Sequence, residues 1–196
     1  MAYQESWFRL QKTTPRLPSY EDRVLYSTWG ISYAQVERQN ANSARLLQLW
    51  AYFDHEDLWF ELLREGHNAG PRWFQELTSD AFGFHDAARV LCYYGLIEPD
   101  TSRAHGSKSG GYGMHGCVHM WVRHVLNEER DNEMARLAMR CVGAHVPRNT
   151  EREYWVVQRR LMGHAGRCVA VQTAERIPIG EGEEWILLSL GDLLAD

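Results

Sequence analysis

One segment, ANSARLLQLWAYF at 41–53, constrains the fold more than any other part of the sequence. If it is a helix, its apolar side chains cover too wide an arc for one exposed face, so the pattern predicts a deeply buried helix. The side chains concerned are Leu46, Leu47, Leu49, Trp50 and Phe53. A helix of this kind needs neighbours on all sides, and we expect it to lie at the centre of a packed core.

Helical periodicity continues on both sides of this segment, with Ser19 as a cap before it and Gly95 as a stop after it. The sequence therefore predicts a mainly α protein. The other helices are expected over SYEDRVLYSTWGISYAQVERQ, LWFELLREG, PRWFQELT, DAFGFHDAARVLCYYG, CVHMWVRHVLNEER, NEMARLAMRCVGAHV, EREYWVVQRRLMGHAGRCVAVQ and the run from Glu183.

A small β-hairpin is expected between 96 and 115. LIEPD is too short for a helix and predicts a strand, and GYGMH can return as its partner. Between them, TSRAHGSKSGG has glycine and serine but no bulky apolar residue, which is typical of an exposed loop. We expect 103–110 to be mobile and open to proteolysis. Helix, strand, loop and strand in this order are the outline of a winged helix.

Composition excludes several classes of protein. The chain has 196 residues, 44% of them hydrophobic, which is typical of a globular protein. Its net charge of -5 creates no positive field that would attract nucleic acid. Four cysteines without CxxC pairs indicate neither a zinc site nor a disulfide scaffold. Since the chain also shows no signal peptide and no long apolar run, we expect a cytoplasmic protein that does not enter a membrane.

Two patterns near the hairpin do not meet the requirements of a nucleotide-binding loop. Gly111, Gly113 and Gly116 match G-x-G-x-x-G, but a polar loop and not an apolar strand precedes them. Lys108 and Ser109 lack the glycines that a phosphate-binding P-loop requires. The sequence thus predicts neither a dinucleotide fold nor a Walker A loop.

Titratable residues gather at His115, Cys117, His119 and His124. His115 and His119 would share one helix face at i and i+4, which is how helical metal sites begin. Two ligands do not complete a site, and the glutamate of HEXXH is absent. We expect no bound metal, and histidines that are packed against aromatic rings or exposed.

Acidic residues at Glu56, Asp57 and Glu61 are interpreted as a solvated helix start and not as paired catalytic acids. No order of Ser, His and Asp indicates a nucleophile. The chain is therefore predicted not to be an enzyme and to bind no cofactor by itself.

His115 has a distinctive position, at the end of the returning strand and directly before a helix that begins near Gly116. Unpaired N–H groups and the helix dipole attract an anion there, so the imidazole could contact a phosphate. A histidine at a helix start can also be an ordinary cap or packing residue. The sequence leaves both interpretations open.

Taken together, these segments resemble the regulatory part of fungal NB-ARC proteins with tetratricopeptide repeats (TPR), NLR-like members of the STAND class of signalling NTPases. The chain at 19–66 looks like the entry to their winged-helix domain, and DAARVLCYYGLIE is similar to the segment before the wing. Met114, His115 and Gly116 fall on the family's Met-His-Asp motif. In that motif the histidine contacts the phosphate of the bound nucleotide and holds the closed state. Gly116 stands where plant relatives have aspartate.

The resemblance implies three segments. Residues 1–18 would be a remnant helix leading out of an absent NB-ARC core, 19–130 the winged-helix domain, and 131–196 a helical connector with the start of a first TPR-like helix. A nucleotide-binding domain would precede Met1 and repeats would follow Asp196, so the chain would be a fragment, a truncated product or a decayed paralogue.

The implied function is regulation and protein interaction, without catalysis. The partners would be the nucleotide-binding domain and other proteins at the helical surface, and ADP or ATP would bind only when that domain is present. Nucleic acid and membrane are not expected as partners.

Two alternatives remain at this stage. In a free-standing winged-helix protein that binds nucleic acid, DAFGFHDAARVLCYYG would enter the major groove. That segment has one arginine, Arg89, against Asp80 and Asp86, and so would gain little from phosphate contacts. A metal-dependent enzyme using His115 and His119 is the other alternative.

Overall fold

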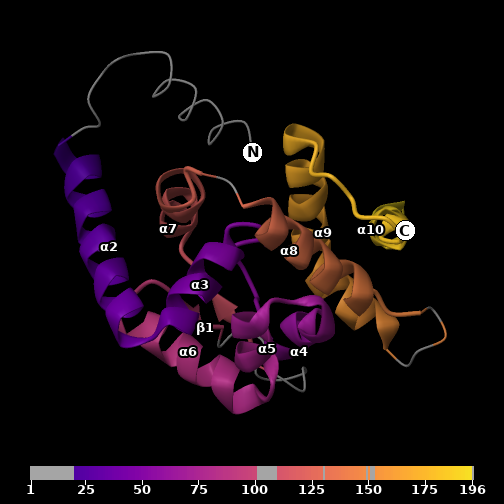
Figure 1. Ribbon diagram of the computed structural model, residues 1–196, viewed down its shortest axis with the longest axis horizontal. Coiled ribbons are helices and arrows are strands. Elements are labelled where there is room, and N and C mark those ends of the chain that lie inside the picture. The colour runs from indigo at the N-terminus through magenta and orange to yellow at the C-terminus, as the bar shows by residue number, and fades with distance from the viewer. Residues whose placement is uncertain (1–19, 101–109, 130, 149, 151–152, 196) are drawn as a thin grey trace.

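The computed structural model describes residues 20–100, 110–129, 131–148, 150 and 153–195. Within them the protein is mainly α with one small antiparallel sheet of two strands, as the sequence predicts (Figure 1). The predicted helix at 1–18 and all of the predicted loop at 103–110 except Gly110 lie outside these residues.

The elements are bounded as follows. The helices are α2 (Tyr20–Gln39), α3 (Ala41–Trp50), α4 (Phe60–Arg64), α5 (Arg72–Thr78), α6 (Ala81–Tyr93), α7 (Gly116–Trp121), α8 (Asn132–His145), α9 (Tyr154–Glu175) and α10 (Glu184–Ala195). The short elements are the 3-10 turn η1 (His67–Ala69), the π-helical turn η2 (Val122–Leu126), β1 (Glu98–Pro99) and β2 (Tyr112–Gly113).

The helices are arranged around α3. It contacts α2, α5, α6, α8 and η2, while α10 packs on α8 and α9. Figure 1 shows α2 along one edge of the molecule and α10, seen end-on, at the opposite edge. The helices before the hairpin and the helices after it therefore pack around a shared core.

The central helix has the position that its apolar pattern predicts. Asn40 caps α3, because its side-chain oxygen accepts hydrogen bonds from the N–H groups of Asn42 and Ser43 at 3.0 and 3.1 Å. Trp50 is completely buried, and its Nε1 donates to the Asp54 carbonyl at 3.0 Å. The helix ends at Trp50, three residues earlier than predicted, and the chain continues as the buried turn 51–53.

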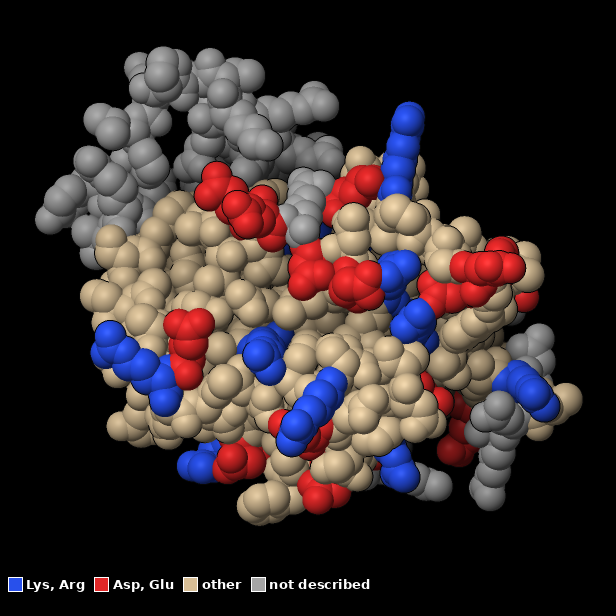
Figure 2. All heavy atoms as spheres, viewed as in Figure 1, with Lys and Arg blue, Asp and Glu red and all other residues tan. Residues whose placement is uncertain are grey.

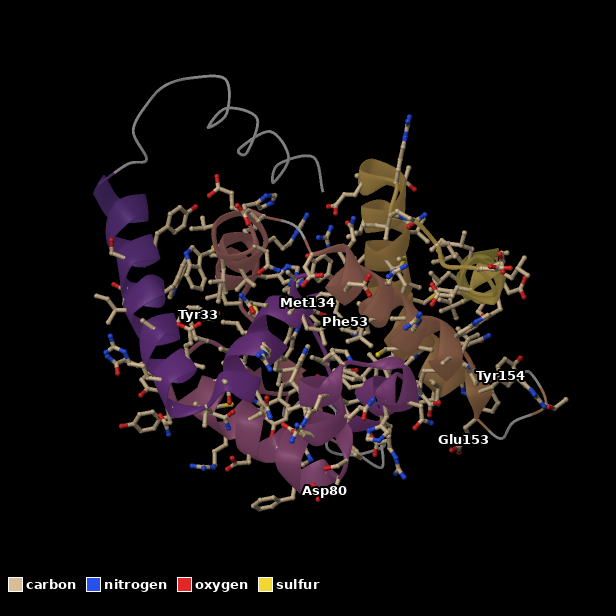
Figure 3. The ribbon with its side chains drawn as sticks, in the orientation of Figure 1. Tyr33, Phe53, Asp80, Met134, Glu153 and Tyr154 are labelled. Carbon is tan, nitrogen blue, oxygen red and sulfur yellow. The ribbon has the colours of Figure 1, made fainter. Side chains whose placement is uncertain are left out.

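The hairpin follows α6 as predicted. Asp80 caps α6 by accepting a hydrogen bond from the Gly83 N–H at 2.8 Å, and Figure 3 shows it at the start of that helix. Beyond the helix, Gly95 has a φ of 66°, which glycine adopts without steric cost. The chain then pairs Pro99 of β1 with Tyr112 of β2.

The helix predicted over CVHMWVRHVLNEER is shorter than expected. After α7 the backbone widens into η2 and leaves the helix at Asn127, whose N–H donates to the Val122 carbonyl at 2.9 Å. The Asn127 side chain donates to the Gln48 carbonyl at 2.9 Å. This contact with α3 explains why the helix does not continue, since a regular turn would carry the amide away from Gln48.

The surface carries both signs of charge. In Figure 2, lysine and arginine side chains alternate with aspartate and glutamate side chains across the face shown. Among the described residues, no helix combines the length and the apolar character needed to cross a bilayer.

Replacing Trp50 by alanine should lower the free energy of unfolding by about 3 to 5 kcal/mol, through lost burial and the cavity left behind. Urea unfolding measures this loss. Trp155→Ala is the matched control, because 55% of the Trp155 side chain is exposed, and it should lose much less. A Trp50→Ala loss no larger than that of the control would contradict the central place of α3.

Candidate functional site

The residues predicted to sense a nucleotide lie at the junction between β2 and α7. Met114 is 3% exposed, and its backbone N–H donates to the His55 carbonyl at 2.7 Å. His115 follows as an exposed residue at the N-cap of α7, and Gly116 is the first residue of the helix. The buried Met114, which we call the anchor, therefore directly precedes the exposed imidazole of His115.

The His115 ring is oriented by the backbone of α7. Its Nδ1 accepts a hydrogen bond from the Cys117 N–H at 3.3 Å. Because Nδ1 is the acceptor, the neutral ring carries its hydrogen on Nε2, which is then a donor. The exposed ring can offer this N–H to an acceptor such as a phosphate oxygen.

Gly116 is not required by packing. A Cβ added at this position would meet no atom within 4 Å. A residue with a Cβ would therefore find space for that atom here.

His119 has a different environment from His115. It is 6% exposed, and its Nε2 lies 3.3 Å from the Trp50 carbonyl and 3.1 Å from the Phe53 carbonyl. Burial is the main cause that lowers its pKa to about 3, with smaller contributions from Arg123 and Arg167. The neutral His119 ring therefore donates to the carbonyls at the end of α3. This agrees with a histidine that is packed in the core. In the parts of the chain that the structure describes, no group of three or more His, Cys, Asp or Glu is placed to hold a metal ion.

The interpretation of Asp57 as part of a solvated helix start is wrong. Its side chain is 4% exposed and receives two hydrogen bonds from Arg160, Nε to Oδ2 and Nη2 to Oδ1, each at 2.8 Å. The guanidinium carbon of Arg160 also lies 3.9 Å from the centre of the Trp59 ring. The partner is a residue of α9, far along the chain, and a local charge pattern cannot reveal it.

His164 of α9 is a polar core residue that the sequence did not single out. Its Nδ1 accepts from the Asp54 N–H and its Nε2 donates to the Asp57 carbonyl, both at 3.1 Å. The ring lies between those of Phe53 and Trp59, with centroid distances of 5.6 and 5.7 Å. Burial lowers the pKa of His164, in agreement with one donor and one acceptor nitrogen. The signal available was its i, i+4 spacing from Arg160 on one helix face.

A pocket lies elsewhere, between the start of α5 and the start of α8. It is lined by Trp73, Met134, Leu137 and Arg140 among others. Figure 3 shows Met134 at the start of α8. None of the three motif residues at 114–116 lines this pocket, so the phosphate contact predicted for His115 does not lie in it.

No family model, no curated protein and no solved structure matches the chain. The interpretation of the site therefore depends on the contacts of its own residues. The strongest of them are the buried anchor at Met114, the oriented ring of His115 and the hydrogen bonds that α9 makes to Asp54 and Asp57.

Acid should destabilise the protein through His119. Its pKa is lowered from 6.5 to about 3, so the unfolded chain binds the proton first and stability is lost as pH falls below about 6.5. Between about pH 7 and pH 5 this residue should account for a loss of about 2 kcal/mol.

His119→Gln tests this dependence, because its amide can still donate to the carbonyls of Trp50 and Phe53. Urea unfolding at both pH values should show a smaller loss for the variant than for the parent. The exposed His85, changed to Gln, is the control and should retain the parental loss. An equal loss in all three proteins would show that His119 is not the group responsible.

Proposed function

We propose that the chain is a regulatory segment of a STAND-type signalling protein, without catalysis of its own, in which His115 contacts the phosphate of a nucleotide held by a separate domain. The observation that carries the proposal is the exposed imidazole of His115, whose Nδ1 is bonded to the Cys117 N–H and whose Nε2–H is therefore a donor. The cytoplasm is the compartment in which such a protein would act.

A phosphate sensor must be held in one place, and two contacts do this for His115. Burial of Met114 fixes the backbone before it, with the 2.7 Å bond to the His55 carbonyl. The Cys117 N–H fixes the ring itself. A donor that is already oriented loses little conformational entropy when it meets its acceptor.

The nucleotide itself has to be held elsewhere. The loop that contacts Met114 carries the acidic Glu56, whose side chain is 72% exposed, and a lone imidazole cannot balance the charge of two or three phosphates. Lysine and Mg²⁺ of a nucleotide-binding domain would supply that balance. His115 then reports on the phosphate and does not bind it alone.

The C-terminal helices offer a surface for other proteins. Leu187, Leu188 and Leu194 of α10 are 40%, 68% and 38% exposed, while Ile186 and Leu190 are buried. An apolar face of this kind supports protein interaction as part of the function.

Nucleic-acid binding has less support. The guanidinium of Arg89, the arginine of α6, is bonded to Asp86 at 2.8 Å, so its charge is already compensated. Mixed charge over the face in Figure 2 also gives no continuous track for a phosphate backbone.

By itself the chain should bind no ATP, because one donor at His115 cannot replace a phosphate-binding loop and Mg²⁺ ligands. Isothermal titration calorimetry with ATP and Mg²⁺ should give no binding heat. A micromolar affinity that His115→Ala abolishes would show that this segment holds the nucleotide itself.

The sensor role is tested in a protein that joins this chain to a nucleotide-binding domain of the resembled family. If His115 favours the closed diphosphate state, His115→Ala should weaken ADP binding by about 5- to 150-fold, the usual range of such couplings. His115→Asn is the matched variant, because asparagine can still cap α7 but places no imidazole N–H at the phosphate.

ADP affinity and melting temperature are measured on both variants. Weaker ADP binding in both, with the melting temperature lowered only in His115→Ala, separates the sensor from the cap. Unchanged ADP affinity in both variants would remove the sensor role and leave His115 as a helix cap.

A further inference from the structure

The loop 54–58 has no regular structure of its own and is held by α9. Arg160 donates two hydrogen bonds to the Asp57 carboxylate, and His164 bonds both the Asp54 N–H and the Asp57 carbonyl. Side chains one turn apart on a single helix therefore hold both ends of this short stretch. Figure 3 shows α9 beginning beside Glu153 and Tyr154 at one edge of the molecule and running past α8 toward the opposite edge.

The same loop holds the strand that leads to His115. Leu58 and Tyr112 exchange two backbone hydrogen bonds, each at 2.9 Å, and the Met114 N–H donates to the His55 carbonyl at 2.7 Å. Gly111 fits closely against it, since a Cβ there would lie 2.2 Å from the Asp57 Oδ1. The backbone hydrogen bonds that 112–114 make outside the hairpin thus go to Leu58 and His55 of this loop. The Tyr112 side chain also contacts α6, where its hydroxyl lies 3.0 Å from the His85 Nδ1.

We propose that Arg160 and His164 of α9 are positioning residues for His115, acting through the loop 54–58 and the strand residues 112–114. The effect on nucleotide binding rests on the proposed function of His115. The mechanical coupling from α9 to His115 does not, and it is testable without a nucleotide.

The state of the loop depends on α9 for a physical reason. Asp57 has a left-handed backbone, with a φ of 53°, which costs a non-glycine residue energy and persists only where its surroundings hold it. The two hydrogen bonds from Arg160 and the one from His164 hold the Asp57 backbone in this conformation. The helices α8 and α10 pack on α9. A partner protein that displaces any of these three helices would release the Asp57 backbone, and Met114 would move with it.

The test is Arg160→Lys, which keeps the positive charge beside Asp57 but cannot form the paired hydrogen bonds of the planar guanidinium. Two readouts are taken by NMR on the isolated chain: the ring nitrogen shifts of His115 and the hydrogen exchange rate of the Met114 amide. We expect changed His115 shifts and exchange at Met114 faster by about 10-fold or more.

Two controls separate positioning from general instability. Arg159→Lys, on the exposed face of α9, should match the parent in both readouts. Leu193→Ala weakens the buried core at α10, which packs on α8 and α9, and should leave the His115 shifts unchanged. His115 shifts in Arg160→Lys that equal those of the parent would overturn the proposal.

A second measurement needs no variant. In the parent protein at low denaturant, the amides of Asp54, Leu58, Tyr112 and Met114 should exchange through one shared opening. Independent opening of Asp54 and Met114 would overturn the proposal even if Arg160→Lys did not fold.

The joined protein then separates this inference from the proposed function. Arg160→Lys should weaken ADP binding in the same direction as His115→Asn. If the exchange data show coupling while His115→Asn leaves ADP affinity unchanged, positioning of His115 stands and its role at the nucleotide fails.

Discussion

Two hydrogen bonds from Arg160 to the buried carboxylate of Asp57 hold α9 against a stretch of irregular backbone inside the protein. Such a backbone cannot satisfy its own polar groups, so side chains from elsewhere must do so. The Ala51 carbonyl accepts from Arg167 at 3.0 Å, and the Phe53 carbonyl accepts from His119 at 3.1 Å. Side chains of both α7 and α9 therefore hold the segment 51–59 in place.

This dependence links the helices and the hairpin of 20–129 to the C-terminal helices. The sequence-based boundary at 130/131 stays a prediction, but contacts cross it, including the bond from the Asp131 N–H to the Tyr52 hydroxyl at 2.9 Å. Such contacts allow binding at one end of the protein to change the other end. His115 lies beyond the same buried stretch and is connected to it through Met114 and His55.

Features decided by near neighbours could be predicted from the sequence. The apolar arc of α3 and the hairpin before His115 are both local patterns, and the structure confirms them. The pair of Asp57 and Arg160 is separated by 103 residues, and a single sequence carries no signal for such a partner. For that reason the sequence alone favours a solvated Asp57, whereas the position of His115 between β2 and α7 follows from local patterns.

The central claim is that the pair of Asp57 and Arg160 holds the buried segment in place, and a double-mutant cycle on the free energy of unfolding tests it most directly. Asp57→Asn and Arg160→Met should each lose about 3 to 5 kcal/mol, since each leaves a buried charge unpaired. The double variant should lose less than the sum, with a coupling energy of about 2 to 3 kcal/mol. Losses that add to within about 0.5 kcal/mol would contradict the account.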